Sequence, residues 1–159
     1  MIPNTQKSSP FVFDNFDTTS IGFDHMQRDE IILYLKYSHQ NYQRTVIPQI
    51  EQSFLGLLKL FPNEPSLTVI FNLFLKFQLS FELHMKIEEA TIYLNETDKK
   101  TAQLDHKEHM HEEPFLTEII SSLKRQKYSN NPFCQILIFK LMNFNIELKQ
   151  HSWIEENLI

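Results

Sequence analysis

Two histidine and glutamate pairs in this chain of 159 residues have the spacing of metal ligands. His84 and Glu88 are four residues apart, and so are His151 and Glu155. On an α-helix, residues four apart stand one turn apart on the same face, so each pair offers an imidazole nitrogen and a carboxylate oxygen together. Both atoms bind transition-metal ions. Each pair therefore predicts half of a metal site.

Two further histidines precede these pairs, so the chain supplies the same half-site twice. His39 comes before the first pair and His109 before the second. Two ions would each receive two histidines, and both carboxylates could bridge them. Mixed nitrogen and oxygen ligation suits iron, so we predict two Fe ions in an oxo- or carboxylate-bridged di-iron centre, with Zn as a substitute in purified protein. The predicted ligands are His39, His84, Glu88, His109, His151 and Glu155.

A single pair with this spacing is a weak signal, because a solvated ion pair on an exposed helix has the same spacing. His109 and Glu113 form such a third match. The two chosen pairs are more specific, because each continues an apolar stripe at helical spacing, and a polar group buried there needs a partner. The alternative is a set of core or boundary histidines that pair with acids and bind no metal.

Other polar residues near the predicted ligands have less specific roles. Glu89 and Glu156 are the fallback ligands if the helical register slips by one residue. Tyr42 follows His39 by three residues, where it either hydrogen-bonds near the metals or lies at the boundary of the core. Three histidines are expected to be solvated surface residues: His25, His106 and His111.

Helix-periodic segments must position these residues. Three stretches of turn-forming residues, 61–65, 95–100 and 127–132, divide the chain after residue 26 into four segments. Each segment has a stripe whose spacings fit one face of a helix. The stripes are Leu35, His39, Tyr42, Val46 and Ile50; Ile70, Phe74, Phe77, Phe81, His84, Glu88 and Ile92; Ala102, His109, Leu116, Ile120 and Leu123; and Leu137, Leu141, Phe144, Leu148, His151, Glu155 and Leu158.

These segments predict an all-α protein. Only two glycines, Gly22 and Gly56, occur, and 42% of residues are hydrophobic, which disfavours a β-protein with many turns. Four helical segments with short connections predict an antiparallel up-down-up-down four-helix bundle over residues 27–159. Residues 1–26 lack a sustained helical period and contain prolines, so they predict an N-terminal arm.

Local signals mark where helices begin and where they are disturbed. Asn131, directly before a proline, is expected to cap the last helix, and Thr97 or Asp98 the helix before it. Pro48 and Pro114 lie inside predicted helices, where each removes a backbone donor. We expect a kink or a local wide turn at both prolines.

Composition excludes several other classes of protein. The net charge of −5 provides no basic surface for nucleic acid and no polybasic anchor for a membrane. The single cysteine, Cys134, excludes a disulfide framework and is expected to be a buried, inert thiol. Neither a signal-peptide pattern nor a long apolar run is evident in the sequence. We therefore expect a soluble, cytoplasmic protein.

The predicted ligands lie in four stretches, 37–48, 83–89, 108–119 and 150–158. Over about residues 30–159 these stretches resemble the hemerythrin-like cation-binding (HHE) domain. They are most similar to the di-iron proteins that repair iron-sulfur clusters, and the resemblance implies a hemerythrin-like fold with the six ligands given above. Oxygen-carrying hemerythrins have a second histidine and an aspartate where this chain has Glu113 and Glu156. Reversible oxygen carriage is therefore disfavoured.

The resemblance implies a function in the response to stress. The chain would be a non-haem di-iron protein that reacts with nitric oxide or oxygen species and could supply iron for repair of iron-sulfur clusters. Its partners would be these diatomic ligands and iron-sulfur proteins. One alternative is a di-iron sensor of oxygen, nitric oxide or redox state, or a binding module without catalytic turnover. Another is a structural bundle without metal. The sequence leaves open whether the protein is an enzyme.

Overall fold

The computed structural model describes residues 22–91, 93 and 99–159, with only the backbone of residues 24 and 99–111. These residues contain helices and no strand, which confirms the predicted all-α class. The elements are η2 (Phe23–His25), a 3₁₀-helix; α1 (Arg28–Asn41); η3 (Tyr42–Val46), a π-helix; α2 (Ile47–Leu60); α3 (Pro65–Ala90); α4 (Lys99–Lys124); and α5 (Pro132–Leu158).

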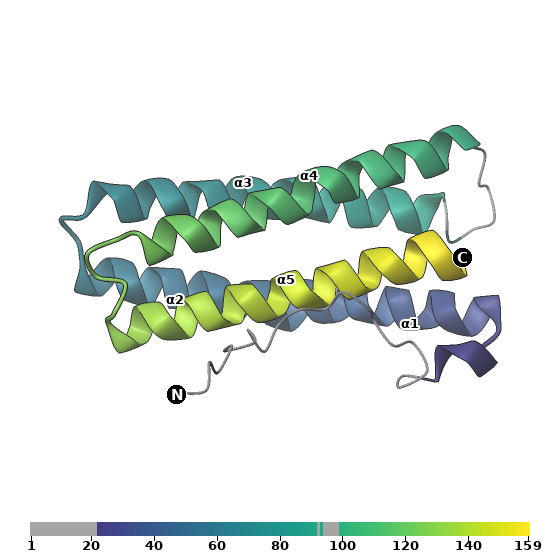
Figure 1. Ribbon diagram of the computed structural model, residues 1–159, viewed down its shortest axis with the longest axis horizontal. Coiled ribbons are helices and arrows are strands. Elements are labelled where there is room, and N and C mark those ends of the chain that lie inside the picture. Colours follow the sequence, from purple (N-terminus) through teal and green to yellow (C-terminus); the bar gives the residue numbers. More distant parts are fainter. Residues whose placement is uncertain (1–21, 92, 94–98) are drawn as a thin grey trace, which may run out of the picture.

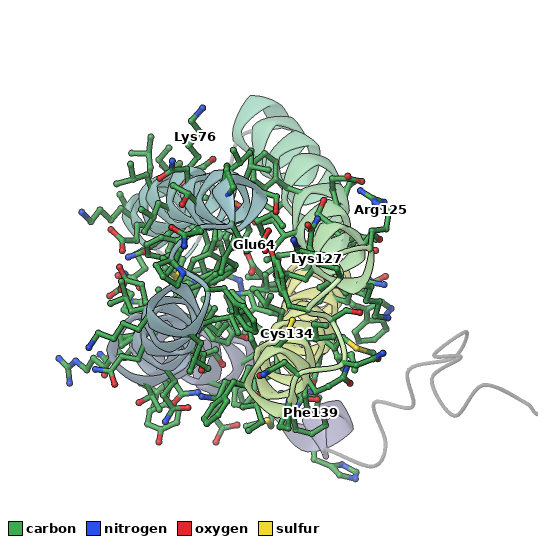
Figure 2. The ribbon with its side chains drawn as sticks, turned by 90° about the vertical axis from the view of Figure 1, so that its left-hand side faces the viewer. Glu64, Lys76, Arg125, Lys127, Cys134 and Phe139 are labelled. Carbon is green, nitrogen blue, oxygen red and sulfur yellow. The ribbon has the colours of Figure 1, made fainter. Side chains whose placement is uncertain are left out.

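The long helices lie lengthwise beside one another, and the two described connections, 61–64 and 125–131, lie at one end of them (Figure 1). Helix α3 packs against α4, α4 against α5, and α2 against both α3 and α5, so the four segments enclose one interior. Figure 2 looks along this interior: Cys134 points into it, whereas Lys76 and Arg125 point outward. The Cys134 thiol is buried as expected, and burial raises its pKa.

Side-chain and proline signals mark the helix starts. The Asn131 side chain accepts a hydrogen bond from the Phe133 N–H at 2.9 Å, with Pro132 at the start of α5, which confirms the predicted cap. At α1 a capping box forms between Gln27 and Glu30. The other expected capping residues, 97 and 98, lie outside the described part of the chain.

The two internal prolines differ in their effect. Just before Pro48 the chain forms the π-helix η3, in which the Ile47 N–H donates to the Tyr42 carbonyl, so the expected wide turn is present. The wider turn takes up one extra residue. As a result Ile47 is buried, and Val46, the residue predicted from spacing, is only half-buried. At Pro114 the helix α4 continues without a wide turn.

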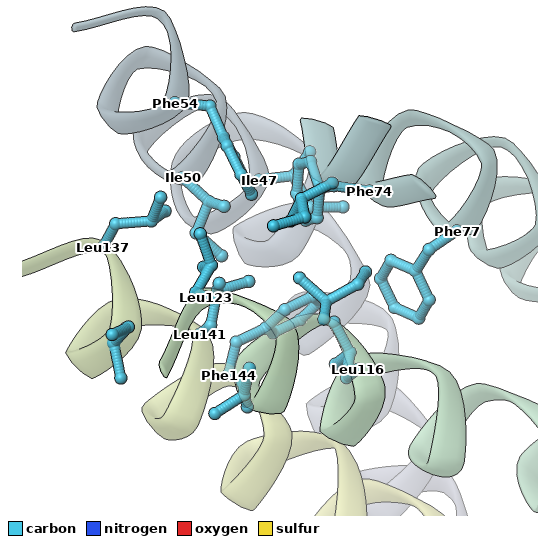
Figure 3. Packing of buried hydrophobic residues seen from close by; sticks show 14 of the residues in the cluster. Ile47, Ile50, Phe54, Phe74, Phe77, Leu116, Leu123, Leu137, Leu141 and Phe144 are labelled. Atoms are coloured by element: carbon cyan, nitrogen blue, oxygen red, sulfur yellow. The ribbon is translucent and has the colours of Figure 1, made fainter. Parts of the chain in front are cut away.

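Apolar side chains form two clusters in the interior. The main cluster is the larger one, and Figure 3 shows part of it, with Phe54 and Phe74 stacked at 5.3 Å between ring centroids. The end cluster joins η2, α1, the segment just after α3 and the end of α5. The main cluster comprises Tyr42, Ile47, Ile50, Phe54, Leu57, Leu67, Ile70, Phe74, Phe77, Phe81, Met85, Leu116, Ile119, Ile120, Leu123, Tyr128, Cys134, Leu137, Ile138, Leu141, Phe144 and Leu148. The end cluster comprises Phe23, Ile31, Ile32, Leu35, Tyr93 and Ile154.

The predicted N-terminal arm falls mostly outside the described residues. Of its described part, Phe23 is buried in the end cluster and meets Tyr34 edge to face at 5.1 Å. His25 is exposed, as expected. Phe23 therefore packs on the bundle, while the boundary at residue 26 stays a prediction.

One described helix, α3, is long and apolar enough to cross a membrane by length and composition alone. In its most apolar stretch, 28% of the residues are buried inside the structure. Core helices of bundles pass the same test, and α3 directs His84 and Glu88 into the interior. The helix is therefore weak support for a membrane span.

The cap at Asn131 provides a test of the fold. Asn131→Ala removes the side-chain acceptor of the Phe133 N–H, so we expect the free energy of unfolding to fall by about 1 kcal/mol in urea denaturation. Asn130→Ala, at the exposed neighbouring position, is the matched control and should change it by less than about 0.5 kcal/mol. Equal effects of the two substitutions would contradict the assigned cap.

Candidate metal centre

A layer of buried histidines and glutamates separates the two apolar clusters. On α5, His151 lies between Leu148 of the main cluster and Ile154 of the end cluster. His39 on α1 and Glu88 on α3 are placed in the same way. Each has a member of the main cluster on one side of it along the chain and a member of the end cluster on the other side. We call these residues the polar layer: His39, His84, Glu88, Glu112, His151 and Glu155, all buried.

The imidazoles of α1 and α5 face each other within this layer. The Nε2 atoms of His39 and His151 are 2.9 Å apart. The Tyr93 hydroxyl lies 3.4 Å from Nε2 of His39 and 3.5 Å from Nε2 of His151. Each imidazole therefore directs the nitrogen that commonly binds metal toward one shared position.

Two carboxylates reach the same position. Glu155 Oε1 lies 2.5 Å from His151 Nε2. Glu88 Oε1 lies 2.5 Å from His84 Nε2, and its Oε2 lies 3.3 Å from His39 Nε2. Glu88 thus directs its two oxygens at histidines of different helices, which is the arrangement of a carboxylate able to bridge two ions.

The charges of the layer require compensation. Three glutamates and three histidines are the buried polar residues of the described chain, and no lysine or arginine is buried with them. An ionised carboxylate in the interior costs several kcal/mol unless it is paired and hydrogen-bonded. Among the buried side chains of the described residues, only the histidines can carry positive charge, so a bound cation is a second way to compensate the carboxylates. The donor chemistry therefore fits a metal ion.

The far nitrogens of two histidines contact further carboxylates. His84 Nδ1 lies 2.6 Å from Glu112 Oε1, and His39 Nδ1 lies 2.9 Å from Glu89 Oε1. A histidine that binds metal through Nε2 is commonly oriented by such a carboxylate, which accepts the Nδ1–H hydrogen bond and fixes the tautomer. Glu89, whose side chain is 43% exposed, is thus placed to orient a ligand. This differs from the fallback role predicted for it.

Five of the six predicted ligands meet in the layer. Ligand atoms of His39, Glu88, His151 and Glu155 all lie within 4.8 Å of one another, and His84 joins them through Glu88. The backbone of the sixth residue, His109, belongs to α4, but its side chain is outside the described part, as are those of His106 and His111. The metal-binding role of all six stays a prediction. Two acids left out of the set are exposed: Glu113 and Glu156.

Sequence reasoning missed Glu112 and Tyr93. Glu112 lies four residues before Leu116 and so continues the buried stripe of α4, but it is absent from the predicted ligands and from the predicted stripe. Tyr93 follows the end of α3, where helical spacing no longer applies. The spacing signal could have identified Glu112. Only the three-dimensional packing identifies Tyr93.

Tyr42 lies beside the layer and faces His151 edge to face, with 5.7 Å between ring centroids. Burial raises the pKa of its hydroxyl, and the nearby Glu147 carboxylate raises it further. The tyrosine thus stays protonated, and its buried ring shapes the pocket around His151.

Comparison with known proteins adds no family assignment. No protein-family model matches the sequence, and neither a curated protein nor a solved structure gives a significant match. The fold and the polar layer therefore carry the functional argument.

The hydrogen bond between His84 and Glu112 provides a test that needs no metal. Glu112→Ala removes a buried acceptor from His84 Nδ1, so we expect it to destabilise the metal-free protein by about 1–3 kcal/mol in urea denaturation. Glu113→Ala is the matched control: its half-exposed pair with Lys149 should contribute less than about 1 kcal/mol. If both variants lose the same stability, Glu112 is not part of the buried layer.

Proposed function

We propose that this chain is a non-haem di-iron protein with an antiparallel up-down-up-down, hemerythrin-like bundle. It acts in the cytoplasm on nitric oxide or oxygen species and supplies iron for the repair of iron-sulfur clusters. The observation that carries the metal-binding part is the buried group of His39, Glu88, His151 and Glu155, whose ligand atoms lie within 4.8 Å of one another.

The types of donor favour iron over several other ions. Calcium and magnesium prefer all-oxygen sites, and structural zinc sites are commonly rich in cysteine. This layer combines imidazole nitrogens with carboxylates and contains no thiolate, since Cys134 belongs to the main cluster. Such a mixed set is typical of non-haem iron, with zinc as a competitor in purified protein.

One observation favours a pair of ions over a single ion. Glu88 directs one oxygen to His84 and the other to His39, so each oxygen can serve a different ion. The predicted ligand His109 belongs to α4, the helix that also carries Glu112, whose carboxylate contacts His84 Nδ1. One ion would then rest on His39, His151 and Glu155, and the other on His84 and His109.

The surrounding residues give this site its chemical setting. Iron, when bound, supplies redox chemistry and an open position for a diatomic ligand. The two apolar clusters cover the layer on the sides that face along the bundle, which strengthens electrostatic interactions within it. The Tyr93 hydroxyl can donate a hydrogen bond at the shared position between His39 and His151. Glu89 and Glu112 hold the imidazoles in orientation.

The arrangement of the helices supports the proposed topology, and the free thiol supports the proposed compartment. The consecutive helices α2 and α3, α3 and α4, and α4 and α5 are neighbours (Figure 1), as an up-down-up-down topology requires. The free thiol of Cys134 fits a reducing compartment such as the cytoplasm.

Metal content tests the proposal. We expect about two iron ions per chain after anaerobic loading and removal of free metal, because six ligands exceed what one ion with an open position takes. Aerobic protein should absorb visible light, whereas a zinc form should not. Glu88→Ala and Glu155→Ala should each lower the bound iron, because they remove the candidate bridges.

Two matched glutamate variants complete that experiment. Glu113→Ala should leave the iron content unchanged, because this side chain is exposed and pairs with Lys149. Glu89→Ala should retain the iron at saturation but weaken the affinity about 10-fold, because it only orients His39. Equal losses in all four variants would overturn the assigned ligands. A stoichiometry of one would overturn the paired site.

The end of α5 provides a second test, because His151 and Glu155 lie close to the last residue of the helix, Leu158. Helix ends fray, so binding metal there should couple to local folding. With free metal at about 100 times the dissociation constant, we expect amide exchange across residues 151–159 to slow by about 100-fold relative to chelated protein. Residues 133–140 of the same helix are the internal control. Unchanged protection at 151–159 on chelation would exclude His151 and Glu155 as ligands.

A further inference from the structure

A cavity of about 230 Å³ opens beside the polar layer, between α1 and α5. These two helices pack against each other, and Figure 1 shows them side by side. His151 and Tyr42 form part of the wall of the cavity. The cavity is therefore a space that reaches a candidate ligand from outside the bundle.

The wall of this cavity is polar. Three tyrosines, a serine, two side-chain amides, a glutamate and a histidine line it, and no aliphatic side chain does. The two amides, Asn41 and Gln150, and the carboxylate of Glu147 offer oxygen atoms. At roughly 30 Å³ per water molecule, the volume corresponds to about eight waters, enough for a cation that keeps its first hydration shell.

Glu147 gives the cavity its negative charge. It lies four residues before His151, one turn away on the same face of α5. Its carboxylate forms no ion pair with any lysine or arginine of the described chain. The Glu147 side chain is exposed, so a cation that enters the cavity can reach its carboxylate. Desolvation raises the pKa of this carboxyl. Glu147 and Tyr42 line the same cavity, and the charge of Glu147 also raises the pKa of Tyr42.

We propose that this cavity is the port through which a hydrated divalent cation reaches the polar layer, with Glu147 as the transient ligand on its wall. The proposal rests on the proposed metal centre and adds the route by which the ion arrives. The cation would exchange its waters for the oxygens of Glu147 and the neighbouring amides and then pass to His151. A neutral diatomic molecule would gain nothing from this charge, whereas a cation is attracted by it.

The rate of metal uptake tests the port separately from the site. Metal-free full-length protein is mixed anaerobically with Co²⁺ in a stopped-flow instrument, and the visible absorption of the bound ion is followed. We expect Glu147→Gln to slow uptake by about 10-fold, the lower end of the effect of charged clefts on association, and Glu147→Lys to slow it further. The final Co²⁺ content should equal that of the wild type.

A remote glutamate gives the matched control. Glu118 is exposed and bonds Arg125, which lies on the outer face in Figure 2. Glu118→Gln and Glu118→Lys make the same charge changes away from the cavity and should leave the rate unchanged. Raising the ionic strength should slow uptake by the wild type more than uptake by Glu147→Gln, because salt screens the attraction.

The possible outcomes separate the port from the proposed function. No uptake by the wild type would overturn the metal centre itself. Normal uptake rates in both Glu147 variants would overturn the port and leave the centre standing. A lower final Co²⁺ content in Glu147→Gln, with an unchanged circular dichroism spectrum, would make Glu147 a permanent ligand and would also overturn the port. Equal slowing by the Glu118 variants would show that the uptake rate depends only on the net charge of the protein, and would overturn the port.

Discussion

Buried negative charge is the constraint on which this structure depends. Glu88, Glu112 and Glu155 lie in the interior of the bundle, and the described chain buries no lysine or arginine with them. Such carboxylates are tolerated only with hydrogen bonds and nearby positive charge. Histidines supply the contacts, and each glutamate lies within 2.6 Å of an imidazole nitrogen. A cation between them would satisfy both kinds of donor at once.

The apolar parts of the fold offset the energetic cost of this polar layer. A buried leucine at each of these stripe positions would stabilise the folded state by roughly 1.5–3 kcal/mol through the hydrophobic effect. The glutamates and histidines do not provide this stabilisation. The aromatic main cluster on one side and the end cluster on the other supply apolar burial. A polar layer between them lowers the stability of the bundle, which is the pattern expected at a functional site.

Periodicity predicted which face of each helix is buried, but not which side chains meet across the interior. Every described residue of the α3 stripe is buried, and the Asn131 cap is present, because both depend on local spacing. The contact between His84 and Glu112 joins residues 28 apart in sequence, and that between Tyr93 and His151 joins residues 58 apart. Such pairs depend on how the helices pack. No rule of local spacing reaches them.

The π-helix before Pro48 joins the polar layer to the apolar core. An α-helix turns about 100° per residue, so the extra residue taken up by η3 shifts everything after it by roughly that angle. With this shift, the bulky side chain of Ile47 faces the interior together with His39 and Tyr42. A regular helix would turn Ile47 away from the face that holds His39. The missing donor of Pro48 thus lies where the first segment changes its helical phase. The first half of the segment can then carry His39, a candidate ligand, and the second half can pack in the core.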